Sequence, residues 1–243
     1  MEKRIPKIVE IPHKFCPGCG HGIVNRLVAE VLEEMGEDSK AICAVAVGCS
    51  SLMPDTYGVD IVQAQHGRAS AVAVGIKRCR PDCMVFSYQG DGDALAIGYS
   101  ETMYAAIRNE NITMIYVNNN NFGMTGGQMS PTTLENQKTT TSPLGRDISL
   151  TGKPVDIIKM MMPLDVAYLA RGTMTNSKEI LKTKKYIRKA FEAQKAGKGY
   201  SMVEVLSPCP TNWGLAPLKA CAHIENTVEG IFPLGEFVGG EQE

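Results

Sequence analysis

The sequence predicts an α/β fold in which a mainly parallel central sheet is flanked by helices. Apolar runs of strand length alternate along the chain with segments whose apolar residues recur at helical spacing. This alternation is typical of parallel sheets. No stretch has the composition of a linker and no segment repeats, so we expect a single domain over residues 1–243, which is enough chain to bury a sizeable core.

The first part of the chain begins with an expected extended arm over residues 1–15, because Pro6 and Pro12 forbid a helix there. A tight turn at Cys16–Gly20 follows. Residues 21–35 then keep apolar side chains at helical spacing and end at Gly36, a plausible helix cap. The next expected elements are a buried strand at 41–47, a short strand at 61–64 and a helix at 69–77.

The second part of the chain continues the same alternation. Residues 129–153 are rich in Thr, Ser, Pro and Gly and predict a long loop, which in a compact domain is functional or covered by a partner. Ser177 is expected to cap a long amphipathic helix, and the tail beyond Trp213 reads as irregular. The other expected elements are strands at 84–88, 112–117, 167–170 and 201–206 and helices at 94–108 and 155–162.

Composition excludes several classes of function. A net charge of −1 gives no basic footprint for nucleic acid or for an acidic membrane surface. No apolar run reaches the roughly 18 residues needed to span a bilayer, and residues 1–6 do not resemble a secretory signal. We therefore expect a cytoplasmic protein whose eight cysteines are reduced and available for a metal or cluster.

Two polar turns follow neighbouring strands. Gly90-Asp91-Gly92-Asp93 ends one strand and opens a helix, and Asn118 to Asn121 end the next. The glycines let backbone N–H groups and the helix N-terminus face an anion. The Asp91 carboxylate, the Asn119 amide and the Asn121 carbonyl supply the oxygen atoms that Mg²⁺ prefers, with Asn118 as the alternative to Asn119. The pattern predicts a metal-bound diphosphate site.

The whole pattern, Gly90-Asp91-Gly92-Asp93, the paired asparagines and the run from Met124 to Thr133, resembles the β subunit of the 2-oxoacid:ferredoxin oxidoreductases. The resemblance covers nearly the whole chain and is weakest beyond Trp213. It implies a thiamine-diphosphate-binding domain that holds thiamine diphosphate through Mg²⁺. The family's Mg²⁺ positions match Asp91, Asn119 and the backbone of Asn121, and its diphosphate positions match Gly90, Gly92, Asp93 and Thr125.

Other residues are expected beside this cofactor. Gly48, Ser50 and Ser51 follow a strand end, and Met124 begins the loop that lines the substrate pocket or a subunit contact. The triplet His66-Gly67-Arg68 resembles family triplets near the cofactor. Arg68 would meet a diphosphate or a substrate carboxylate, or alternatively form a surface ion pair. Lys138, Arg146 and Lys153 read as solvated loop residues.

Four cysteines are candidates for a [4Fe–4S] cluster. Cys16 and Cys19 form a chelating pair, while Cys49 and Cys209 follow two strands whose ends share one sheet edge. Structural zinc or a redox dithiol is the alternative reading, and Cys43 is the alternative to Cys209. The local sequences resemble the family's cluster segments, so that the N-terminal arm and C-terminal tail would carry or flank the cluster cysteines. Cys79, Cys83 and Cys221 read as non-ligands.

The resemblance implies CoA-dependent oxidative decarboxylation of a 2-oxo acid, 2-oxoglutarate or 2-oxoisovalerate, with electrons passed to ferredoxin. No glutamate here is identified as the activator of the cofactor, so no catalytic residue is assigned to this chain. The family places that glutamate on an α subunit, which implies a chain active only with partners, γ and ferredoxin-like δ subunits included. The alternatives are a non-redox thiamine-diphosphate decarboxylase subunit with structural zinc and a non-catalytic metal-binding scaffold.

Overall fold

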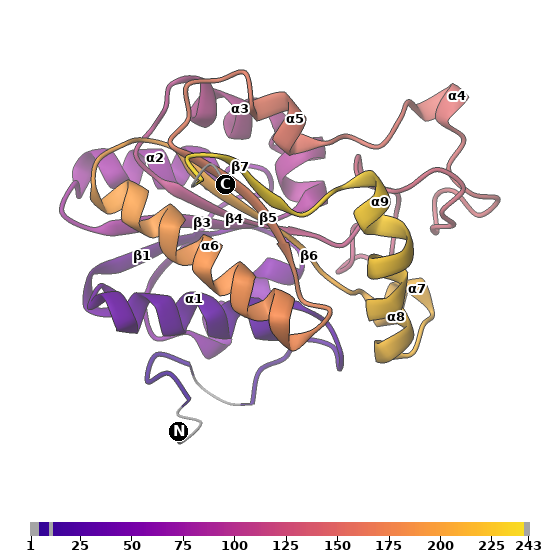
Figure 1. Cartoon of the computed structure of the whole chain (residues 1–243), viewed down its shortest axis with the longest axis horizontal. Helices are drawn as coiled ribbons and strands as arrows, with labels where there is room; N and C mark the ends of the chain where they lie inside the picture. Colours follow the sequence, from indigo (N-terminus) through magenta and orange to yellow (C-terminus); the bar gives the residue numbers. More distant parts are fainter. Residues whose placement is uncertain (1–4, 10–11, 241–243) are drawn as a thin grey trace.

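The chain folds around one large sheet. A computed structural model describes residues 5–9 and 12–240 (Figure 1). Within these residues the sheet has seven strands in the order β2-β1-β3-β4-β6-β5-β7, and every neighbouring pair is parallel except β5 with β7. The strands are β1 (Ala41–Val45), β2 (Asp60–Gln63), β3 (Met84–Gly90), β4 (Thr113–Asn118), β5 (Tyr168–Thr173), β6 (Ser201–Leu206) and β7 (Gly235–Val238). The α/β prediction with a mainly parallel sheet is confirmed.

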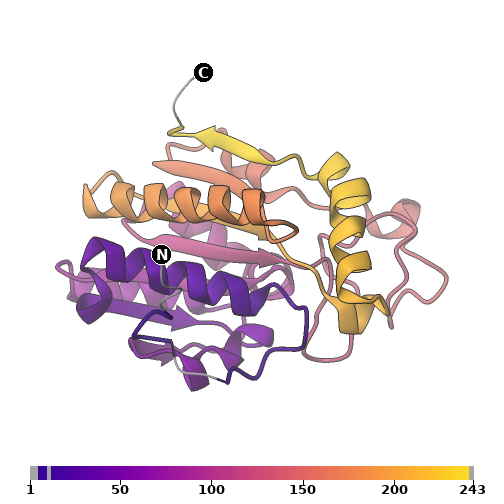
Figure 2. The same ribbon diagram turned by 60° about the horizontal axis from the view of Figure 1, so that its bottom comes forward.

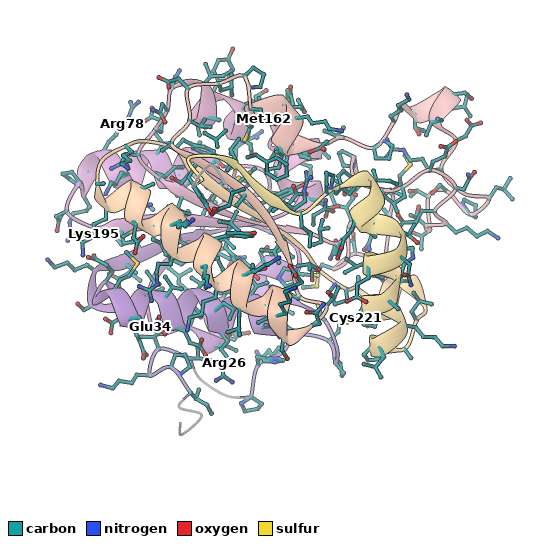
Figure 3. The ribbon with its side chains drawn as sticks, in the orientation of Figure 1. Arg26, Glu34, Arg78, Met162, Lys195 and Cys221 are labelled. Carbon is teal, nitrogen blue, oxygen red and sulfur yellow. The ribbon has the colours of Figure 1, made fainter. Side chains whose placement is uncertain are left out.

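Helices cover both faces of the sheet, so that the molecule has three layers (Figures 1 and 2). One face packs against α1 (His21–Met35) and α6 (Ser177–Lys195). Lys184 joins these two helices through Glu30 and Glu34, both at 2.7 Å, and Figure 3 shows Glu34 on α1 beside α6. The other face carries α2 (Ala69–Cys79), α3 (Tyr99–Ile107) and α5 (Ile157–Met161). Among the described residues, no helix combines the length and apolar character needed to cross a bilayer.

Most of the short elements lie beyond the carboxyl ends of the parallel strands, where ligand sites of open α/β sheets lie. In Figures 1 and 2 the loop that carries α4 (Ile148–Thr151) extends past this end, next to the helices that follow β6. The remaining elements are η1 (Asp38–Lys40), η2 (Cys49–Leu52), η3 (Pro54–Thr56), η4 (Gly92–Ile97), α7 (Pro210–Trp213), α8 (Pro217–His223), η5 (Ile224–Val228) and α9 (Glu229–Ile231).

The helix expected over 94–108 is divided in two. A π-helical turn, η4, runs over Gly92–Ile97, and α3 begins after Gly98. The division lies where the backbone of Gly98 packs directly on Gly67, since a Cβ at Gly98 would stand 2.3 Å from the Gly67 carbonyl oxygen. This contact joins the start of α3 to the turn before α2.

The tail expected to be irregular instead forms helices and a strand. Pro217 begins α8, where proline's missing N–H is no loss. Ile224, Val228 and Phe232 are buried together in a small apolar cluster, and β7 closes the edge of the sheet beside β5. The cap of α6 is Asn176 rather than Ser177, because the Asn176 side chain accepts from the Glu179 N–H. Parts of the expected arm and tail, residues 1–4, 10–11 and 241–243, lie outside the described residues.

Candidate functional site

A cavity of about 190 Å³ opens at the carboxyl ends of β1, β3 and β4. Its walls come from the turns that follow these strands, from the start of α1 and from the turn before α2. Most of the residues expected beside a cofactor line it: Gly48, Ser50, Ser51, His66, Gly90, Asp91, Gly92, Asp93, Asn119, Asn121, Met124 and Thr125. Cys49, His21 and Phe122 also line it, whereas Gly67 and Arg68 do not. Among the described lining residues there is no glutamate.

Three oxygen-bearing groups meet at one point of the cavity wall. The Asn119 side-chain amide has one end 2.8 Å from the Asn121 carbonyl oxygen and 3.2 Å from Asp91 Oδ1. Turned so that its nitrogen occupies this end, the amide donates to both oxygens. Turned so that its oxygen occupies it, three oxygens face one another with no hydrogen between them. Adjacent ligands of an octahedral Mg²⁺ are about 2.9 Å apart, so the second orientation fits a bound cation.

The other Asp91 oxygen is held by two hydroxyls that the sequence did not point to. Ser130 Oγ donates to Asp91 Oδ2 at 2.6 Å, and Thr132 Oγ1 donates to the same atom. Burial raises the pKa of Asp91 to about 6, and the two hydroxyl donors act in the opposite direction. Both hydroxyls belong to the aperiodic segment after Gln128, whose only sequence signal was its hydroxyl content.

Asn118 and Asn120 face away from this meeting point. The Asn118 amide nitrogen donates to Glu204 Oε1 at 2.8 Å, and its oxygen accepts from the Asn120 N–H at 3.1 Å. Asn120 has φ = 56°, the left-handed conformation that asparagine tolerates. Glu204 in turn accepts from Arg171 Nε at 2.7 Å, and both side chains are buried. The geometry favours Asn119 over Asn118 as the metal position.

Asp93 lines the cavity, but its carboxylate is occupied by protein donors. Oδ1 accepts from the Gly67 N–H at 2.7 Å and lies 2.5 Å from His66 Nδ1. Oδ2 accepts from Gln89 Nε2 at 2.8 Å. Asp93 therefore fixes the turn that carries His66. Arg68 pairs with Glu101 at 2.7 Å near the surface, the alternative contact expected from the sequence.

His21, at the start of α1, has the surroundings of a structural residue. Its Nδ1 lies 2.7 Å from the Tyr88 hydroxyl, and its ring stacks on Phe15 at a centroid distance of 5.2 Å. The side chain is 1% exposed, and burial lowers its pKa to about 4. The ring is therefore neutral at pH 7.

The four candidate cluster cysteines lie near one another, beside the part of the cavity wall that Cys49 forms. The Cys16–Cys19 turn packs on the segment before Cys209, where the Gly20 N–H donates to the Pro208 carbonyl at 3.4 Å. Cys209 Sγ contacts Asn121 Oδ1 at 3.9 Å, and a Cβ on Gly123 would stand 3.0 Å from Cys49 Sγ. Cys49 and Cys209 thus adjoin the asparagine turn that carries the candidate metal position.

Two of these four thiols, Cys19 and Cys49, are affected electrostatically by neighbouring candidates. Burial first, and then the neighbouring cysteines, raise the pKa of Cys49 to about 12 and that of Cys19 to about 11. Among the described residues, no three His, Cys, Asp or Glu side chains are grouped so that they could hold one metal ion. In a [4Fe–4S] cluster each thiolate binds a different iron, so its ligands need not meet at one point.

The remaining cysteines lie elsewhere. Cys43 is buried in β1, with its sulfur 3.9 Å from Met53 Sδ. Cys79 is exposed at the end of α2, and Cys83 is buried just before β3. Cys221 is half-buried on α8 (Figure 3).

Arg146 was expected to be solvated, and the structure contradicts this. Its side chain is buried at 3% exposure within the loop that follows β4. The guanidinium makes hydrogen bonds to backbone carbonyls of the same loop, which no local pattern in the sequence indicates.

Comparisons with known proteins find related chains. The family model described as thiamine pyrophosphate enzyme, C-terminal TPP binding domain, matches residues 46–205. The 2-oxoglutarate synthase subunit KorB of Methanocaldococcus jannaschii is 40% identical over 84% of this chain and 72% of that protein. The ketoisovalerate oxidoreductase subunit VorA of Methanothermobacter thermautotrophicus is 41% identical over 92% of this chain, which spans only 47% of that subunit.

Solved structures give the same result for the fold. The 2-oxoglutarate:ferredoxin oxidoreductase from Magnetococcus marinus, with 2-oxoglutarate, coenzyme A and succinyl-CoA bound, aligns with a TM-score of 0.79 and 26% identity. The alignment covers all of this chain and 87% of that one. A thiamine-diphosphate-dependent 4-hydroxybenzoylformate decarboxylase of Rhodococcus jostii aligns with a TM-score of 0.50 at 16% identity, a likeness of fold alone.

Proposed function

Because this chain belongs to the β-subunit family of the 2-oxoacid:ferredoxin oxidoreductases, with a thiamine-diphosphate-binding domain, we propose that it holds Mg²⁺–thiamine diphosphate and a [4Fe–4S] cluster. With partner subunits it carries out the CoA-dependent oxidative decarboxylation of a 2-oxo acid and passes electrons to ferredoxin. In this proposal residues 1–243 form one cofactor-binding domain that acts in the cytoplasm, where its thiols stay reduced.

The observation that carries the proposal is the meeting of Asp91 Oδ1, the Asn119 amide and the Asn121 carbonyl in the cavity wall. A carboxylate, an amide oxygen and a carbonyl oxygen are hard ligands suited to Mg²⁺, and two diphosphate oxygens and a water would complete its octahedron. Asp91 brings the negative charge. Asn119 and Asn121 add neutral ligands from the next strand end, which fixes the cation between β3 and β4.

The rest of the cavity would hold the organic part of the cofactor. Gly90 and Gly92 leave backbone close to the diphosphate, and Thr125 adds a hydroxyl nearby. His66 is oriented by Asp93. Gly48, Ser50, Ser51 and Met124 line the same cavity and are proposed to contact the cofactor or substrate, and Gly67 and Arg68 to support the turn of His66. When bound, thiamine diphosphate supplies the carbanion and the electron sink of the reaction.

The cysteines are proposed to hold the cluster beside this cavity, with Cys16 and Cys19 on one side and Cys49 and Cys209 on the other. Support comes from Cys49 in the cavity wall and from Cys209 against Asn121. A structural zinc would need four donors about 2.3 Å from a single ion. Among the described residues no such grouping is found, and structural zinc stays the alternative that the metal analysis below tests.

A partner subunit is part of the proposal because the cavity lacks a carboxylate for the aminopyrimidine. Among its described lining residues the carboxylates are Asp91 and Asp93, of which the first faces the metal position and the second is held by protein donors. We propose that the activating glutamate comes from an α subunit. Further clusters belong on γ or ferredoxin-like δ subunits, since this chain has no second cysteine repeat.

The substrate is proposed to be 2-oxoisovalerate or 2-oxoglutarate, because the relatives named above carry those two activities in their names. Assaying the complex with 2-oxoglutarate, 2-oxoisovalerate and pyruvate tests this directly. A preference for pyruvate contradicts the substrate assignment and leaves the cofactor assignment standing.

The metal site is tested by calorimetric titration of thiamine diphosphate in the presence of Mg²⁺. The variant Asp91→Ala should lose Mg²⁺-dependent binding, while Asp165→Ala, at an exposed position far along the chain, should bind like the wild type. Unchanged affinity in Asp91→Ala refutes the metal site and favours the scaffold alternative.

The cluster is tested by colour and metal content. Protein purified without oxygen should show the broad visible absorption of an iron–sulfur cluster and bleach with dithionite. Cys209→Ser should lose iron, whereas Cys79→Ser, at an exposed cysteine, should keep it. Colourless wild-type protein with stoichiometric zinc contradicts the cluster and favours the non-redox decarboxylase, and full iron in Cys209→Ser indicates Cys43 as the ligand.

A further inference from the structure

Arg146 is a buried cation without a carboxylate partner among its hydrogen bonds. Its Nη1 donates to the carbonyls of Ser130, Pro131 and Thr133 at 3.3, 2.9 and 2.6 Å. Its Nε and Nη2 donate to Thr151 and Lys153 oxygens at 3.3 Å. All of these acceptors are neutral. Burying a charge on neutral acceptors is costly, and burial lowers the pKa of this guanidinium accordingly.

The three carbonyls that accept from Arg146 Nη1 belong to one four-residue turn, which we call the hydroxyl turn (residues 130–133). Three of its four carbonyl oxygens accept from the same Nη1. The turn also closes on itself, since the Ser130 N–H donates to Thr133 Oγ1 at 2.9 Å. The planar fork of arginine can serve this many acceptors at once, which the single ammonium of lysine cannot do with the same geometry.

The hydroxyl turn touches both strand-end turns that carry the proposed metal ligands. Ser130 and Thr132 donate to Asp91 Oδ2, after the end of β3. On the other side, Thr133 Oγ1 donates to the Asn120 carbonyl at 2.7 Å, and Asn120 Nδ2 donates to the Thr132 carbonyl at 2.9 Å. These contacts fix the residue that lies between Asn119 and Asn121.

We propose that Arg146 is a positioning residue for the metal–diphosphate site: it holds the hydroxyl turn in place, and the hydroxyl turn directs Asp91 and the asparagine turn toward the cation. The inference rests on the proposed function, because it assigns a role around the same metal. Arg146 itself does not line the cavity, so it would act only through the hydroxyl turn.

The arrangement determines how Asp91 can bind. With Oδ2 occupied by two hydroxyl donors, only Oδ1 faces the Asn119 amide and the cation. The carboxylate is thereby restricted to one ligand atom, which suits the strict octahedron of Mg²⁺. Without the guanidinium, the hydroxyl turn would lose the donor that its carbonyls share. The Asp91 carboxylate would then be free to turn its Oδ2 toward the metal.

The test measures Mn²⁺ affinity, by electron paramagnetic resonance, in the full chain purified with its partner subunits and saturated with thiamine diphosphate. Replacing a residue that orients a metal ligand typically weakens metal affinity by about 10- to 100-fold. We expect Arg146→Lys and Thr132→Val each to raise the Mn²⁺ Kd within this range. Thr132→Ser, which keeps the hydroxyl, should bind like the wild type, as should Arg108→Lys at an exposed arginine just after α3.

A double variant distinguishes positioning from general loosening. If Arg146 acts through the hydroxyl turn, Arg146→Lys combined with Thr132→Val should raise Kd by less than the product of the two single effects. A wild-type Kd in Arg146→Lys, with or without a lowered Tm, overturns the inference.

The Thr132 variants decide if Arg146→Lys does not fold. An unchanged Kd in Thr132→Val overturns the inference independently, because the hydroxyl turn would then not act on Asp91. Failure of the wild type to bind Mn²⁺ would instead refute the proposed function.

Discussion

Replacing Arg171 with methionine should destabilise the protein more than any surface substitution. The Arg171 side chain is 0% exposed. Its Cζ lies over two aromatic rings, 5.3 Å from the centre of Phe232 and 5.6 Å from the centre of Phe237. Its Nε donates to Glu204 at 2.7 Å and its Nη2 to Asp156 at 2.5 Å. Methionine keeps most of the apolar stem and removes the charge, so Glu204, 1% exposed, is left without its cation.

The size of the destabilisation follows from leaving the Glu204 carboxylate without its cation. Removing one partner of a buried ion pair typically costs about 3–5 kcal/mol. That is a large fraction of the roughly 5–15 kcal/mol by which domains are stable. With a urea m-value of roughly 3 kcal/mol per M, a loss of about 4 kcal/mol lowers the unfolding midpoint by about 1.3 M.

The assay is urea unfolding followed by circular dichroism, with Arg108→Met as the matched control. Arg108 also lies over an aromatic ring, 5.7 Å from the centre of Tyr104, but on the surface. Its loss should change the free energy of unfolding by no more than about 0.5 kcal/mol. Removing both charges in Arg171→Met with Glu204→Met should recover most of the loss. Equal effects of Arg171→Met and Arg108→Met would refute the reasoning.

Two further predictions concern pH and close packing. Because the folded-state pKa of His21 is about 4, below the ordinary 6.5 of the unfolded chain, its contribution to stability is present above pH 6.5 and is lost as pH falls toward 4. Between pH 7 and 5, the free energy of unfolding of the wild type in urea should fall by about 2 kcal/mol relative to that of His21→Phe, because the slope is about 1.36 kcal/mol per pH unit. A difference between the two proteins that stays constant over this range would contradict the prediction. Gly98→Ala should lower Tm, since its Cβ would meet the Gly67 carbonyl at a cost of about 1–3 kcal/mol. Gly75→Ala in α2 is the control: its Cβ would meet open space, and alanine's higher helix propensity should raise Tm. A similar fall in Tm in both variants would show that the Gly67 contact does not cause the loss of stability in Gly98→Ala.

Local sequence patterns were sufficient for most strands of the sheet, for the strand-end turns and for the family. Apolar runs predicted β1, β3, β4 and β6, since buried parallel strands are continuously apolar. Parallel strands share one edge, so Asp91 and Asn119 could be expected side by side from the ends of β3 and β4 alone. The resemblance carried by these motifs is confirmed by the relatives.

What sequence reasoning missed depends on contacts between distant segments. The hydroxyl turn and Arg146 lie in a loop without periodicity, where nothing local separates a buried arginine from a solvated one. The division before α3 requires Gly98 to meet Gly67, and each glycine alone looks like an ordinary turn residue. Asp93 follows the diphosphate motif in sequence, yet its carboxylate serves Gly67 and Gln89 across a turn that only the folded chain brings near.

The order of strands in the sheet has a consequence for how the protein is made. β6 lies between β4 and β5, although it is synthesised after both. During translation β4 therefore presents an unpaired apolar edge, and β5 has neither of its neighbours, until residues 201–206 have emerged. Cys209, three residues beyond β6, appears later still. Assembly of a cluster that uses Cys209 must follow the synthesis of β6. On the ribosome the nascent chain would therefore pass through a long stage at which chaperones can bind the unpaired edge of β4.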